Sequence, residues 1–84
     1  MKTEMVINGF KSMVNGLCEE CEAVDSLEKL NSLTDQFDGA RKTIVCFMFY
    51  CRPETEDLLY PVLADARQAF KNARQAAYDR LTKI

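Results

Sequence analysis

Apolar residues recur at steps of three and four through three successive segments of this sequence. Such spacing places them on one side of an α-helix, which repeats about every 3.6 residues. The three apolar series are Val6, Phe10, Met13, Leu17, Cys21 and Val24, then Leu27, Leu30, Phe37, Ile44, Met48 and Cys51, and finally Leu59, Leu63, Ala66, Phe70, Ala73, Ala77, Leu81 and Ile84. The chain is therefore predicted to be all-α.

Residues that begin or end helices separate the three segments. Asp25 and Glu28 are spaced as in a capping box, in which the first side chain accepts a backbone amide and the Glu reaches back to the cap. Pro53 disfavours helical geometry at Arg52, so a helix is expected to end there. The predicted helices span residues 3–24, 26–51 and 61–83. Because short connections make neighbouring helices antiparallel, we expect an up-down-up three-helix bundle, with residues 1–84 forming one domain.

Two residues inside the helical segments oppose helix formation. Pro61 has no amide proton, and in a helix interior its ring would clash with the carbonyl of Asp57. The sequence therefore favours a third helix that opens at Pro61, or a short turn over residues 54–59 joined to that helix through a kink. Gly39 costs about 1 kcal/mol relative to Ala. We expect the second helix to continue through it.

Residues 44–51 are apolar without interruption. They are rich in β-branched and aromatic residues, so a β-strand is the alternative to a helix. A lone strand would find no partner within this chain, and unpaired buried amides are costly. The strand would thus require a sheet between molecules, and the helix is favoured.

As a helix, this block is apolar on every side, which a three-helix bundle does not require. Ile44 and Met48 can face the other two helices. The remaining large apolar side chains, which form the candidate partner interface, are Val45, Phe47, Phe49 and Tyr50. Residues 54–60 could fold over them, another protein's helix could bind them, or a second copy could cover them. We favour a homodimer or higher oligomer that forms through the C-terminal half of the second helix.

The net charge of -2 conceals an uneven distribution. Residues 1–40 hold three Lys and eight acids, whereas residues 66–84 hold five basic residues and one acid. The basic end of the third helix would lie beside the acidic end of the first, so complementarity within the chain could explain it. The alternative is an anion site for a nucleotide or short RNA. Its candidate residues are Arg67, Lys71, Arg74, Tyr78, Arg80 and Lys83.

The four cysteines form two pairs along the chain, Cys18 with Cys21 and Cys46 with Cys51. In continuous antiparallel helices the two pairs lie roughly 25 Å apart, far beyond one zinc coordination sphere. We therefore expect no metal and no cofactor. The cysteines are interpreted as small core residues in a reducing cytoplasm.

The composition also disfavours catalysis and membrane insertion. The chain has no His, the commonest general acid or base. Its longest apolar run is far shorter than the ~20 residues of a membrane span, and no signal-peptide pattern is evident. No motif is specific enough to name a family. We expect a soluble, unprocessed, non-enzymatic interaction protein, an adaptor or inhibitor that binds a macromolecular partner; the alternative is a binder or sequesterer of a phosphate-bearing ligand.

Overall fold

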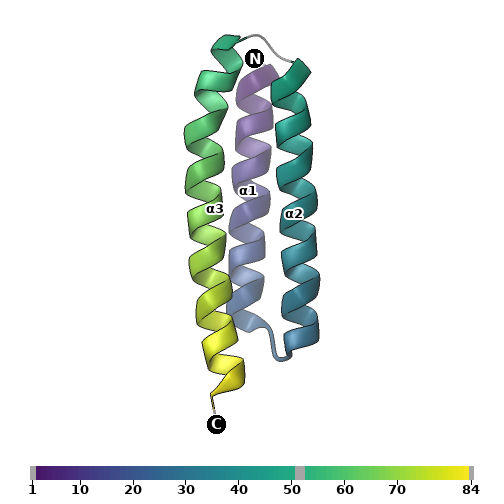
Figure 1. Ribbon diagram of the computed structural model, residues 1–84, viewed down its shortest axis with the longest axis vertical. Helices are drawn as coiled ribbons and strands as arrows, with labels where there is room; N and C mark the ends of the chain where they lie inside the picture. The colour runs from purple at the N-terminus through teal and green to yellow at the C-terminus, as the bar shows by residue number, and fades with distance from the viewer. Residues whose placement is uncertain (1, 51–52, 84) are drawn as a thin grey trace.

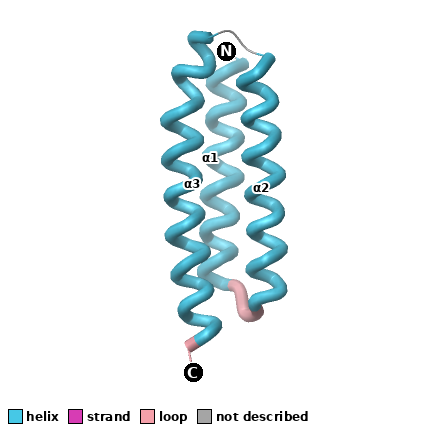
Figure 2. Tube along the Cα trace, in the orientation of Figure 1, coloured by secondary structure: helices cyan, strands magenta, loops and turns pink. Residues whose placement is uncertain are grey.

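A computed structural model describes residues 2–50 and 53–83 of the chain. Three helices make up almost all of this part: α1 (Lys2–Ala23), α2 (Leu27–Tyr50) and α3 (Pro53–Thr82). They lie side by side, and each packs against both others in an up-down-up bundle of 49 × 17 × 17 Å (Figure 1). The described residues form helices and loops and no strand (Figure 2). The predicted three-helix bundle is confirmed.

Ser26, in the turn between α1 and α2, caps the N-terminus of α2. Its hydroxyl oxygen accepts a hydrogen bond from the backbone amide of Lys29 at 3.2 Å, and its carbonyl accepts one from the amide of Leu30 at 3.1 Å. The prediction that Asp25 caps this helix is wrong, because α2 begins at Leu27 and the cap moves one residue along the chain. Asp25 instead forms a surface ion pair with the Lys29 ammonium at 2.9 Å, and this hydrogen bond lowers the pKa of the carboxyl.

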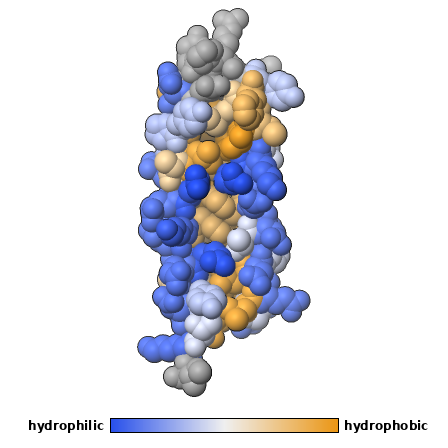
Figure 3. Space-filling view, viewed as in Figure 1, coloured by the Kyte–Doolittle hydropathy of each residue, from blue (hydrophilic) through white to orange (hydrophobic). Residues whose placement is uncertain are grey.

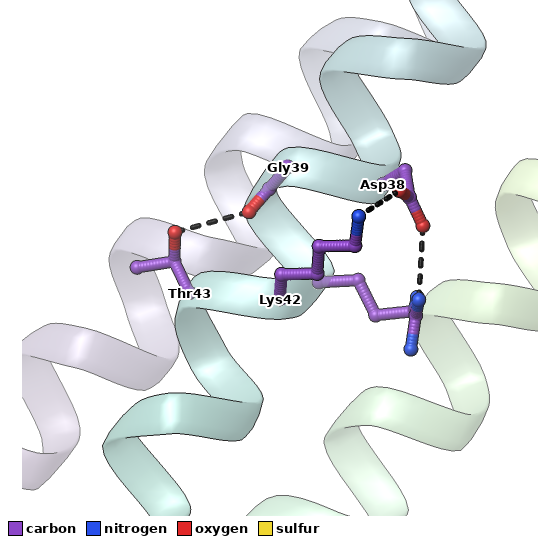
Figure 4. Close-up of polar contacts among 5 residues, drawn as sticks. Asp38, Gly39, Lys42 and Thr43 are labelled. Carbon is purple, nitrogen blue, oxygen red and sulfur yellow. Dashed lines mark hydrogen bonds and ion pairs between the residues drawn. The ribbon is translucent and has the colours of Figure 1, made fainter.

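The second helix continues through Gly39 and through the apolar block to Tyr50, as expected, and the strand alternative is wrong. Gly39 adopts no positive φ, and a Cβ placed on it would meet no atom within 4 Å. The Thr43 hydroxyl donates to the Gly39 carbonyl at 3.0 Å (Figure 4). Cys51, the predicted last residue of this helix, lies outside the described residues.

Replacing Gly39 by Ala is expected to raise the free energy of unfolding by about 1 kcal/mol. The new methyl group enters open space, and Ala loses less backbone entropy on folding than Gly. Urea denaturation followed by circular dichroism measures the change. The reverse substitution at an exposed helical position, Ala76→Gly, should lower the free energy of unfolding by a similar amount. A destabilised Gly39→Ala protein would contradict the prediction.

The third helix begins at Pro53, eight residues before the predicted start at Pro61. Pro53 occupies the first helical position, where its missing amide proton costs nothing and its fixed φ suits the helix. Pro61 lies inside the helix, which therefore forms one continuous element instead of opening there. Burial of Leu59 offsets the cost of a proline inside the helix. The Leu59 side chain is completely buried, and it reaches the core only if the helix extends past Pro61 towards the N-terminus.

The core runs along the length of the bundle between the three helices. Its fully buried side chains are Cys21, Leu30 and Leu59, one from each helix. Most of the predicted apolar positions are buried, but Met13 and Leu27 are exposed, Leu27 because it is the first residue of α2, and Val14 takes the place of Met13 in the core. None of the described helices contains an apolar stretch that could cross a bilayer.

Candidate functional site

Large apolar side chains remain exposed at the end of the bundle where α1 and α3 begin and α2 ends (Figure 1). We call this set the apolar end. Its members are Met5, Phe49, Tyr50, Leu58 and Tyr60. An apolar groove of about 270 Å³ between α1 and α2 also begins at Met5 and is lined further along by Ala40 and Ile44. Five of the eight large apolar side chains that are exposed among the described residues therefore lie at this end.

The four residues predicted as a partner interface divide into two pairs. Val45 and Phe47 are partly buried and pack against the core, so their own chain covers much of them. Phe49 and Tyr50 are 79% and 91% exposed. The segment expected to fold over this block is the first part of α3, which buries Leu59 in the core and leaves the aromatic pair exposed.

Three residues of the apolar end were missed in the sequence. Leu58 and Tyr60 lie before the predicted helix start at Pro61, in the segment expected to connect the helices, and Met5 directly precedes Val6, the first residue of the predicted apolar series. The signal for Leu58 and Tyr60 was the apolar run over residues 58–64, in which Pro61 is the central residue. This run lies entirely within α3, which begins at Pro53.

A second candidate surface is a groove of about 560 Å³ between α2 and α3, here called the α2/α3 groove. Figure 3 views this side of the bundle and shows a hydrophobic strip between hydrophilic flanks. The groove is lined by Thr34, Phe37, Asp38, Arg41, Ala64, Arg67, Gln68, Phe70, Lys71 and Arg74. The rings of Phe37 and Phe70 stack with their centroids 4.4 Å apart and their planes 2° from parallel.

Two sets of hydrogen bonds orient polar side chains that line this groove. The Arg74 Nε donates to the Thr34 hydroxyl oxygen at 3.0 Å, and that hydroxyl donates to the Leu30 carbonyl at 3.0 Å. On α2, the Asp38 carboxylate accepts from Arg41 at 2.9 Å, and Lys42 pairs with the same carboxylate at 3.1 Å (Figure 4).

The Asp38 carboxylate remains ionised at neutral pH. Hydrogen bonds from Arg41 and then from Lys42 hold the pKa of Asp38 below its usual range. The α2/α3 groove therefore carries four cationic side chains against one carboxylate. Its net positive charge contrasts with the net charge of -2 of the whole chain.

The structure separates the six predicted anion-binding residues. Arg67, Lys71 and Arg74 line the α2/α3 groove, and Arg41 joins them from the facing helix. Tyr78, Arg80 and Lys83 lie beyond the groove towards the C-terminal end of α3. Arg41 was missed because its position opposite the basic stripe depends on how α2 and α3 align, which the spacing within one helix does not specify.

Arg80 has a structural partner on α1. Its guanidinium donates to the backbone carbonyls of Cys21 and Val24, at 3.1 and 2.8 Å. These carbonyls belong to the last turn of α1 and to the residue that follows it, where the last acceptors lack helical partners and the helix dipole favours a cation. Arg80 thus ties the end of α3 to the end of α1.

The expected complementarity between the acidic end of α1 and the basic end of α3 does not take the form of ion pairs. Among the described residues, the ion pairs join Asp25 to Lys29 and Asp38 to both Arg41 and Lys42. All of these lie within α2 and the turn before it. Contact between the two helix ends uses the α1 carbonyls instead.

Replacing Arg80 by Met is expected to lower the free energy of unfolding by about 1–2 kcal/mol, because two carbonyls lose a charged donor while the apolar stem is kept. Urea denaturation followed by circular dichroism measures the loss. Lys83→Met, a neighbouring cation for which the structure shows no hydrogen bond to a described residue, serves as the control and should change stability by less than about 0.5 kcal/mol. Equal losses in the two variants would contradict this role for Arg80.

Known proteins supply no functional residues for this chain. Comparison with protein-family models, curated proteins and solved structures gave no match. The two candidate surfaces differ in chemistry, since the apolar end presents aromatic and aliphatic side chains and the α2/α3 groove presents cations. They therefore call for different ligands.

The three described cysteines are free thiols with different exposure. Cys21 is fully buried, Cys18 is partly buried and Cys46 is exposed, whereas Cys51 lies outside the described residues. Burial raises the pKa of both Cys18 and Cys21, and the nearby Glu22 adds to the effect at Cys18. Both groups are thus protonated at neutral pH and act as small core side chains. Within the described residues, no group of three or more potential ligands could hold a metal ion.

Proposed function

We propose that this chain is a non-enzymatic interaction protein, an adaptor or inhibitor, that binds a partner protein through the apolar end. The observation that carries the proposal is the exposure of Phe49 and Tyr50 at consecutive positions of α2. Burying an aromatic side chain of this size is worth about 1.5–3 kcal/mol, and aromatic residues dominate the energetics of protein interfaces. A surface of this kind gains most by contact with another protein.

The first partner that we propose is a second copy of the chain. The exposed aromatic pair ends α2, so a two-fold axis near this end would place the pair of one copy against that of the other. Each copy would then cover apolar surface that its own helices leave exposed.

The absence of buried polar or charged side chains among the described residues supports a non-enzymatic role. Catalytic acids and bases are usually desolvated to tune their pKa, and the carboxylates whose burial the structure describes are exposed or partly exposed. A cytoplasmic location belongs to the same proposal and is supported by the free thiols of Cys18, Cys21 and Cys46.

Sedimentation velocity across the micromolar range tests the pairing of two copies. We expect the parent chain to dimerise and Phe49→Asp/Tyr50→Asp to remain monomeric. The matched control is Leu27→Asp/Tyr78→Asp, which places the same two charges on exposed apolar residues at the opposite end of the bundle. The control should dimerise like the parent. A parent that stays monomeric, or equal losses in the two variants, would contradict self-association through the apolar end.

The same three proteins test binding to a different partner. In a pull-down from the native host lysate, a partner that uses the apolar end should be retained by the parent and by Leu27→Asp/Tyr78→Asp. It should be lost with Phe49→Asp/Tyr50→Asp. Retention by all three proteins would place the interaction elsewhere on the bundle.

A further inference from the structure

We propose that the α2/α3 groove binds an oligophosphate, that is, a di- or triphosphate group, either free or as the phosphate chain of a nucleotide. The proposal is independent of the apolar end, because it depends on cations and not on exposed aromatic residues. It goes beyond partner binding by assigning a ligand class to a second surface.

The first argument is the concentration of charge. Arg41, Arg67, Lys71 and Arg74 line one groove in an acidic chain. Arg67 and Lys71 form no ion pair with any described residue. Like charges one turn apart on a helix repel each other, so this arrangement costs stability until an anion neutralises it.

The second argument is the geometry of the cations. Arg67, Lys71 and Arg74 follow one another at steps of four and three along α3, which spreads their attachment points over about 10 Å. Arg41 faces this row from α2 across the same groove. A row with one cation opposite can contact several linked phosphates at once, whereas a single phosphate would use only part of it.

The third argument is that two of the arginines are held in place before any ligand binds. Thr34 holds the Nε of Arg74, so its two terminal nitrogens can point into the groove, where they donate to no described residue. Asp38 holds one terminal nitrogen of Arg41. Because guanidinium groups bind phosphate through two parallel hydrogen bonds, fixing their orientation reduces the entropy lost on binding.

The aromatic residues of the groove indicate that a base is not the group recognised. Phe37 and Phe70 are only 8% and 4% exposed and stack on each other, so neither offers a free ring face to a nucleobase. Tyr78, the expected stacking platform, does not line the groove. Single-stranded nucleic acids depend on such stacking for affinity, so the groove suits phosphates better than RNA.

Isothermal titration calorimetry with tripolyphosphate, ATP and adenosine tests the proposal. We expect tripolyphosphate and ATP to bind with affinities within about tenfold of each other, and adenosine not to bind. Binding should weaken as salt is added, because the interaction is between charges. If ATP alone binds, or a single-stranded oligonucleotide binds and tripolyphosphate does not, recognition of oligophosphate by this groove is overturned.

Variants locate the site. Arg67→Glu/Lys71→Glu should weaken tripolyphosphate binding by about 100-fold or more, since two charge-assisted contacts are lost and two repulsions are added. Lys11→Glu/Lys83→Glu changes the total charge equally at exposed positions outside the groove and should weaken it by less than about threefold. Thr34→Val, which leaves the charge unchanged but releases Arg74, should weaken it several-fold. No binding to the parent at low salt, equal losses in both charge-reversal variants, or an unchanged affinity in Thr34→Val would overturn the proposal.

Discussion

Replacing Leu59 by Ala is expected to lower the free energy of unfolding by about 2–5 kcal/mol, whereas Leu58→Ala should lower it by less than about 1 kcal/mol. The two leucines are neighbours on α3, but Leu59 is 0% exposed and Leu58 is 58% exposed. Removing the Leu59 side chain therefore loses buried apolar area and leaves a cavity between the helices. Domains of this size have a total stability of only about 5–15 kcal/mol, so the loss is a large fraction of it.

Urea denaturation followed by circular dichroism measures both variants, at a protein concentration low enough to keep the chain monomeric. If two copies pair through the apolar end as proposed, sedimentation at higher concentration should show weaker dimerisation for Leu58→Ala than for Leu59→Ala, because Leu58 is exposed at the apolar end and Leu59 is buried within its own chain. A Leu58→Ala protein as unstable as Leu59→Ala would show that the first part of α3 packs differently. Comparison of two adjacent leucines thus separates folding from association.

Helical periodicity predicted the architecture because a three-helix bundle buries one side of each helix and little else. The steps of three and four identified core positions on all three helices, among them Cys21, Leu30 and Phe70. The error at Met13 arose because both Met13 and Val14 lie at helical spacing from Phe10, and only the neighbouring helices determine which one is buried.

The helix ends were predicted less well, because a single residue can be overruled by packing far from it. The rule that Pro breaks helices predicted a start at Pro61, but burial of Leu59, two residues earlier, favours a helix from Pro53. Similarly, Asp25 and Ser26 are both good caps. Only the observed hydrogen bond from the Lys29 amide distinguishes them.

The candidate surfaces were predictable where they lie on one helix and unpredictable where they need two. Phe49 and Tyr50 followed from an apolar block that no single helix face could bury, and Arg67 and Lys71 followed from their spacing. Arg41 reaches the same groove from α2, so it depends on how the helices align. Arg80 shares the charge of the basic stripe, but its hydrogen bonds to α1 could be seen only in three dimensions.

Pro61 is a helix-breaking residue at an exposed position inside α3. Pro61→Ala is expected to raise the free energy of unfolding by about 2 kcal/mol. Ala supplies the amide proton that can donate to the Asp57 carbonyl, and it removes the clash of the proline ring with that carbonyl. Greater freedom of the unfolded chain offsets about 0.4–1 kcal/mol of the gain. Because Pro61 is exposed, its ring contributes little packing that Ala would lose.

Pro61→Gly separates the backbone effect from helix propensity. Gly also restores the amide proton, but it is about 1 kcal/mol less favourable than Ala in a helix and loosens the unfolded chain further. The free energy of unfolding should therefore increase in the order parent, Pro61→Gly, Pro61→Ala, with the last step close to 1 kcal/mol or more. Urea denaturation at low protein concentration gives this order. If Pro61→Ala is no more stable than the parent, Pro61 does not destabilise α3. Burial of Leu59 is then not needed to offset a helix-breaking residue at that position.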